Sequence, residues 1–94
     1  MSDYYITIPT DVRKDDRLRA NEKILYGELL ALSNKQGYCT AINEDLAELY
    51  GVTTRIISLW IANLVEHGYL HREMVKEGNK PMQRRLWTRQ GRKC

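Results

Sequence analysis

Apolar side chains recur every three or four residues over residues 22–34, which predicts an amphipathic helix there. Leu25, Leu29 and Leu32 share one face of this helix. Asn21 precedes it, and an asparagine in that position commonly caps the first helical turn. The pattern therefore predicts a first helix that buries its leucine face.

A second apolar pattern, over residues 53–67, has four members on one face: Ile57, Trp60, Ile61 and Leu64. Thr53 is placed to cap this helix, and Gly68 is a typical end signal because glycine accepts a left-handed backbone. A short helix is expected before it, capped by Asn43 and ended by Gly51. The chain thus contains three predicted helices.

The spacing within residues 43–61 matches a helix-turn-helix unit. Counted from Asn43, seven required residue types fall at their expected places: Leu46, Ala47, Tyr50, Gly51, Val52, Ile57 and Trp60. The small Ala47 lets two helices cross closely, and Gly51 permits the turn between them. One match is common by chance, whereas all seven together predict a DNA-recognition scaffold.

Strand-like segments flank the helices. Residues 69–76 and 83–88 are separated by a Gly-Asn-Lys-Pro turn at 78–81, which predicts a β-hairpin. Residues 4–9 form a shorter β-rich run that ends in proline, so we expect an extended arm or edge strand packed on the domain. The predicted fold class is mainly α with a small β-hairpin, a winged helix-turn-helix of three helices plus a wing.

The predicted organisation has a single folded domain. An N-terminal arm covers residues 1–20, the winged helix-turn-helix domain residues 21–89, and a basic tail residues 90–94. A chain of 94 residues with 43% hydrophobic and 29% charged residues has room for one core and is typical of a soluble protein. It has neither an apolar run that could cross a membrane nor a secretory signal, so we expect no membrane role and a cytoplasmic location.

Charge is distributed unevenly along the chain, whose formal net charge is +3. Residues 1–70 carry seven basic and ten acidic side chains, whereas residues 71–94 carry eight basic and two acidic ones, a local charge of +6. The last quarter is therefore expected to face a polyanion. Residues 43–67 have a net charge of −3, which argues against strong phosphate binding by the helix pair alone. A second basic group at residues 13–19 is interleaved with aspartates, which indicates local ion pairing.

The second helix of a helix-turn-helix enters the major groove, where its N-terminal residues contact base edges. The candidate DNA-binding residues are Thr53, Thr54, Arg55, Ser58 and Asn63 on this helix and Lys80, Arg84 and Arg85 on the wing. Arg55 is the best candidate for base recognition, because a guanidinium can bind guanine through two hydrogen bonds. Because strand side chains alternate, only one of Arg84 and Arg85 can face a duplex.

Several of these candidates also have a purely structural explanation. Arg55 could be a solvated surface arginine, and Thr53 and Thr54 could serve the helix as caps. The wing cations could be a solvated charge run.

A protein-interaction role is the alternative for the outward face of the same helix. Leu59 points outward, where it could contact a thymine methyl group or, with Ile56 and Ala62, form an apolar patch for another protein chain. Tyr4 and Tyr5 in the arm are further candidates for a protein interface. A dimerisation or interaction module therefore stays open as an alternative function.

The tryptophan, histidine and cysteine residues are expected to have structural roles rather than roles in nucleobase stacking, metal binding or catalysis. Trp60 is expected in the core, and Trp87 is expected to close the core rather than to stack on a base. His67 and His71 are separated by the helix-ending Gly68, and the two cysteines lack a metal-binding spacing, so no metal or other cofactor is predicted. No catalytic arrangement of serine, histidine and acid stands out, so an enzyme is not predicted.

A family resemblance extends over residues 4–88. The residues that carry it are Tyr5-Ile-Thr-Ile-Pro9, Val12-Arg13, Asn21-Glu-Lys-Ile-Leu-Tyr26, Gly37-Tyr-Cys39, Asn43, Leu49-Tyr-Gly-Val-Thr53, Ser58, Trp60-Ile61, Leu64 and Gly68-Tyr-Leu70. Together they resemble the winged-helix N-terminal domain of phage and plasmid replication proteins of Gram-positive bacteria. The chain is similar to the DnaD-like replisome organisers and to the RepA-type plasmid initiators.

This resemblance implies sequence-specific binding of double-stranded DNA in the initiation of plasmid or phage replication, with origin recognition and primosome assembly in a bacterial cell. It also implies a homodimer or higher self-association, and a replicative helicase partner engaged through a separate C-terminal domain. A phage or plasmid transcriptional repressor of the same fold is the nearer alternative.

Overall fold

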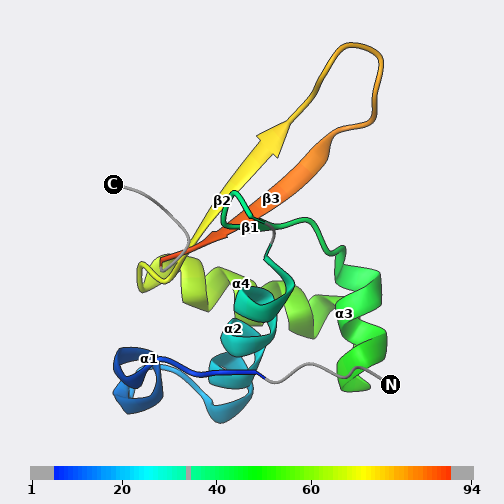
Figure 1. Ribbon diagram of the computed structural model, residues 1–94. Helices are drawn as coiled ribbons and strands as arrows, with labels where there is room; N and C mark the ends of the chain where they lie inside the picture. Colours follow the sequence, from blue (N-terminus) through cyan, green and yellow to red (C-terminus); the bar gives the residue numbers. More distant parts are fainter. Residues whose placement is uncertain (1–5, 34, 90–94) are drawn as a thin grey trace.

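The computed structural model describes residues 6–33 and 35–89, which form four helices and one three-stranded antiparallel sheet. The elements are α1 (Thr10–Lys14), α2 (Ala20–Leu32), β1 (Tyr38–Cys39), α3 (Asn43–Tyr50), α4 (Thr54–Glu66), β2 (Leu70–Val75) and β3 (Gln83–Thr88). The strand order β1-β3-β2 makes β3 the central strand. β2 and β3 extend away from the helices as a wing (Figure 1). The predicted winged helix-turn-helix fold is confirmed.

The turn between α3 and α4 forms as predicted. Gly51 has φ 66° and ψ 35°, the left-handed conformation that a residue with a side chain rarely adopts. The Thr53 hydroxyl accepts a hydrogen bond from the Ile56 backbone N–H at 3.3 Å and so caps α4. Glycine and threonine thus fix the angle at which the two helices of the unit cross.

The predicted caps of the other two helices are wrong. α2 begins after Arg19, whose backbone N–H donates to the Glu22 carboxylate at 2.8 Å, so Asn21 lies inside the first turn. α3 begins after Ile42, and Asn43 is its first helical residue. A carboxylate three residues into a helix can satisfy the backbone as well as a preceding asparagine can.

Two elements were not predicted, the five-residue α1 and the two-residue β1. Val12 in α1 is fully buried, so the segment expected to be an arm contributes to the core. Residues 6–9 form no strand, but they pack on α2, where a Cβ added to Gly27 would lie 3.2 Å from Ile8 Cγ1. β1 pairs with the base of β3.

The core lies between the helices and the inner face of the sheet. α4 contributes the four residues that the apolar pattern predicted: Ile57, Trp60, Ile61 and Leu64. They meet Leu25 and Leu29 from α2 and Leu86 from β3, all fully buried. This packing presents the opposite face of α4 to solvent.

Candidate nucleic-acid interface

The exposed face of α4 begins at its first turn. Thr54 and Arg55 are exposed there, and Leu59 and Ala62 continue the same face further along the helix. Leu59 is 61% exposed and Ile56 36% exposed, as expected for residues opposite the core. This face therefore combines one cation with an apolar patch.

Ser58 lies on the flank of α4 that faces the wing, and it is bound to other side chains. Its hydroxyl accepts from Asn43 Nδ2 at 2.9 Å, and Asn43 Oδ1 accepts from Arg84 Nη1 at 2.6 Å. Arg84 Nη2 also donates to the Ala41 carbonyl at 2.7 Å. We call the side chains of Arg84, Asn43 and Ser58 the wing-side link, because they join β3, α3 and α4.

Arg84 is therefore used within the protein, contrary to the expectation of a free wing cation. Burial lowers the pKa of its guanidinium, which nevertheless stays charged because its ordinary pKa is so high. Leu86, two residues along β3, is fully buried on the same inner face. The side chain consequently points from the strand toward α3 and α4.

Arg85 lies on the outer face of the sheet, so the predicted opposite orientation of the two arginines is confirmed. Its guanidinium stacks 4.6 Å from the centroid of the Tyr38 ring. Trp87 packs beside the same ring at 4.9 Å and donates to Glu73 at 3.0 Å. The prediction that Trp87 closes the core is therefore wrong, because this tryptophan covers the outer face of the sheet.

Asn63 lies on the other flank of α4, against α2. Its Nδ2 donates to Glu22 Oε1 at 2.7 Å, and Glu22 is only 4% exposed. We call this pair the core-side link. Asn63 thus holds α4 to the first turn of α2, and its predicted contact with DNA stays a prediction.

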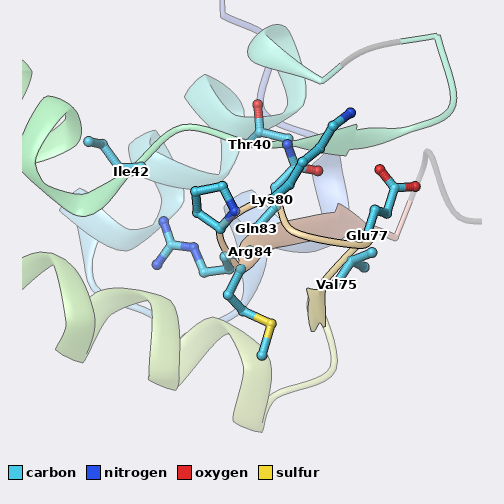
Figure 2. A pocket seen from close by; sticks show the side chains of 9 residues that line it. Thr40, Ile42, Val75, Glu77, Lys80, Gln83 and Arg84 are labelled. Carbon is cyan, nitrogen blue, oxygen red and sulfur yellow. The ribbon is translucent and has the colours of Figure 1, made fainter.

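The wing also carries exposed cations that are not engaged in this way. Lys76 and Lys80 are exposed, and so is Arg72, which pairs across the sheet with Leu86 and shares its face. A hollow of about 450 Å³ separates the distal wing from the loop at residues 40–42. Figure 2 shows Lys80 and Arg84 at this hollow, with the Arg84 guanidinium on the side of Ile42.

Other arginines are neutralised locally. Arg89 forms an ion pair with Asp11 at 2.8 Å and stacks on the Tyr69 ring at 4.3 Å. Arg17 pairs with Asp15 at 2.6 Å and, together with the Tyr69 hydroxyl, holds the pKa of that carboxyl well below its usual range. The predicted ion pairing in the 13–19 segment is confirmed for Arg17.

Several sequence candidates lie outside the described residues. These are Tyr4 and Tyr5, proposed for a protein interface, and the basic tail at residues 90–94. Within the described residues, no three histidine, cysteine, aspartate or glutamate side chains cluster as metal ligands would. His67 follows the end of α4, and His71 lies on β2.

Comparison with known proteins gives one result. A family model for the helix-turn-helix domain matches residues 16–70, more than half of the chain, from the loop before α2 to the first residue of β2. No curated protein and no solved structure shows a significant match. Among the described residues, no helix is long and apolar enough to span a membrane.

Proposed function

The chain belongs to the helix-turn-helix domain family, and from this premise we propose that it binds double-stranded DNA with α4 in the major groove and the wing on the backbone. The observation that carries the proposal is the exposure of Thr54 and Arg55 at the N-terminal end of α4. This is the end of a recognition helix that meets base edges. Neither ion pair found in the described residues involves Arg55, so its guanidinium is available to guanine.

We assign the backbone contacts to the exposed cations of the wing. Lys80 was already predicted from the sequence as a DNA-binding residue of the wing. We add the exposed Arg72 and Lys76 as backbone contacts in place of Arg84. Thr53 and Ser58 each accept one hydrogen bond within the protein, so each keeps its hydroxyl proton and one lone pair for a contact with DNA. Arg85 lies on the outer face of the sheet, so it can contact only a nucleic acid that also reaches that face.

Fluorescence anisotropy of the 94-residue chain with a mixed-sequence duplex, repeated at several salt concentrations, tests this proposal. We expect a log-log slope of about −4 or steeper, because each neutralised phosphate contributes about −0.9. Arg55→Ala should relax base preference at one position, whereas loss of a wing lysine should weaken binding to all duplexes alike. Absence of binding at low salt would sink the proposal.

The biological role that we favour is origin recognition in plasmid or phage replication, with a homodimer or higher assembly on the DNA. It is supported by the resemblance over residues 4–88 to replication proteins, including the segment Gly37-Tyr-Cys39. Selection of binding sites from random DNA distinguishes this role from repression. Iterated direct repeats would favour an initiator, and a two-fold palindrome would favour a repressor.

A second candidate function rests on the apolar patch of Ile56, Leu59 and Ala62. The 61% exposure of Leu59 favours contact with a protein surface or a thymine methyl group. The variant Leu59→Glu distinguishes a protein contact from a DNA contact. Sedimentation measures its self-association, and fluorescence anisotropy measures its DNA binding in parallel. Loss of self-association with DNA binding retained would assign the patch to a second copy, whereas loss of DNA binding alone would assign it to the groove.

A further inference from the structure

A hollow lies between the C-terminal half of α2 and α3. Its volume is about 580 Å³, and its lining residues are Glu28, Leu32, Ala41, Asp45, Leu46, Glu48 and Leu49. Three of these are carboxylates, and none is basic. A polyanion such as DNA is repelled from a site of this charge, so the hollow is separate from the proposed DNA surface.

Glu28 is the unusual member of this lining. It is 7% exposed, and its Oε2 atom has no hydrogen-bond partner among the described residues. Burial raises the pKa of the Glu28 carboxyl, which is the expected response of an acid that has lost water without gaining a donor. Buried polar groups are normally paired, so an unpaired carboxyl oxygen on a residue that lines a hollow indicates a missing donor.

Apolar side chains precede and follow Glu28 along α2. Ile24, Glu28 and Leu32 follow one another at intervals of four residues along α2, and Ile24 and Leu32 are 38% and 40% exposed. Leu49 on α3, at 56% exposed, forms the opposite rim. The surface is thus an apolar groove with a buried acid in its middle and two exposed acids, Asp45 and Glu48, on the α3 side.

We propose that this hollow is a docking site for a protein partner, and that the partner presents a lysine or arginine between two apolar side chains. The cation supplies the donor that Glu28 Oε2 lacks, and the flanking apolar side chains cover Leu32 and Leu49. Asp45 and Glu48 attract the basic segment and determine its orientation. The charge complementarity selects a basic segment over an acidic or neutral one.

Selection of random 12-residue peptides on the intact 94-residue chain tests the proposal. We expect enrichment of sequences with one Lys or Arg between apolar residues. A synthetic peptide of that consensus should bind at least tenfold more weakly when norleucine replaces the cation. The same loss of affinity is expected when the unmodified consensus peptide binds the Glu28→Gln protein, because glutamine has nearly the same shape as glutamate but no negative charge.

Controls separate this result from a folding defect and from DNA binding. Asp16→Asn removes an exposed acid far along the chain from the hollow and should leave peptide affinity unchanged. Thermal melting reports whether Glu28→Gln folds, and Leu49→Ser, on the exposed rim, provides a second variant that should weaken the peptide several-fold. Duplex binding should be the same for Glu28→Gln and wild type, so failure of the DNA proposal leaves this test intact.

Three results would overturn the proposal. The first is a selection that enriches no peptide. The second is enrichment of peptides that lack a cation, or of peptides that bind Glu28→Gln and Leu49→Ser as tightly as they bind the wild-type protein. The third is a self-association of the chain that Glu28→Gln abolishes, because the occupant would then be a second copy. Sedimentation of wild type and variant at matched concentrations detects this last result.

Discussion

The two flanks of α4 are fastened to the protein in different ways. On one flank the core-side link joins Asn63 to a buried Glu22 that also caps α2. On the other, the wing-side link joins Ser58 through Asn43 to the half-buried Arg84. The first connection ties helix to helix within the core, whereas the second ties the helix pair to the wing. We infer that one flank maintains stability and the other maintains the angle between α4 and the wing.

The largest effect is expected from breaking the core-side link with Glu22→Ala. This change removes the acceptor of the Arg19 backbone N–H and leaves Asn63 Nδ2 only its longer bond to the Arg17 carbonyl, which should cost about 2–3 kcal/mol of unfolding free energy. Thermal denaturation measures the loss. Glu22→Gln keeps an acceptor and should recover most of it, and the salt slope of DNA binding should not change below the melting transition. A melting temperature equal to wild type would show that the link is dispensable.

Breaking the wing-side link with Asn43→Ala should cost less stability, about 1–2 kcal/mol, because the site is partly exposed. Its distinguishing effect is on DNA. We expect a several-fold loss of duplex affinity, because the wing is no longer held at a fixed angle to α4. Asn21→Ala, at an exposed asparagine in the first turn of α2, is the matched control. Equal affinities for the two variants would contradict the assigned role of the link.

Arg84→Lys and Arg85→Lys sharpen the comparison within the wing. Lysine keeps the charge but cannot bridge Asn43 and the Ala41 carbonyl as a guanidinium does, so Arg84→Lys should lose about 1 kcal/mol of stability. Arg85→Lys should remain within about 0.5 kcal/mol of wild type. Chemical denaturation of both proteins gives the two values, and the reverse order would mean that the outer face of the sheet matters more.

The smallest effect on stability is expected for Lys80→Ala, because this side chain is exposed. Its effect should appear only in DNA binding, as a salt slope that is less steep by about 0.9. Lys14→Ala in α1 removes an equally exposed lysine and should leave the slope unchanged. If both variants change the slope equally, the binding is a general response to net charge.

Sequence patterns predicted the parts of the fold that depend on periodicity and on special backbone conformations. The apolar face of α4 and the left-handed Gly51 are examples, and so are the bounds of β3. β1 was not predicted because a segment of two residues is too short to show the alternation of apolar and polar side chains that marks a strand. Only its pairing with β3 makes it a strand. α1 escaped because a single buried residue, Val12, faces the core.

The candidate site was less predictable, because residue type does not reveal which partner a side chain will find. Asn43 was expected as a cap, yet it bridges residues fifteen and forty-one positions away. The sequence does contain a signal for Arg84: it lies two residues before the apolar Leu86 on the same strand, and strand alternation places both side chains on the inner face. The position of Asn63 depended on Glu22, a charged residue that the leucine pattern of the first helix gave no reason to place in the protein interior.

The short β1 strand also has an evolutionary consequence. It pairs only with Leu86 and Trp87, so the root of the hairpin is three strands wide, while the outer part consists of β2 and β3 alone. Residues added or removed between positions 76 and 82 would lengthen or shorten the hairpin without disturbing a core residue. Natural variants of this protein can therefore diversify in hairpin length while keeping the helical body unchanged.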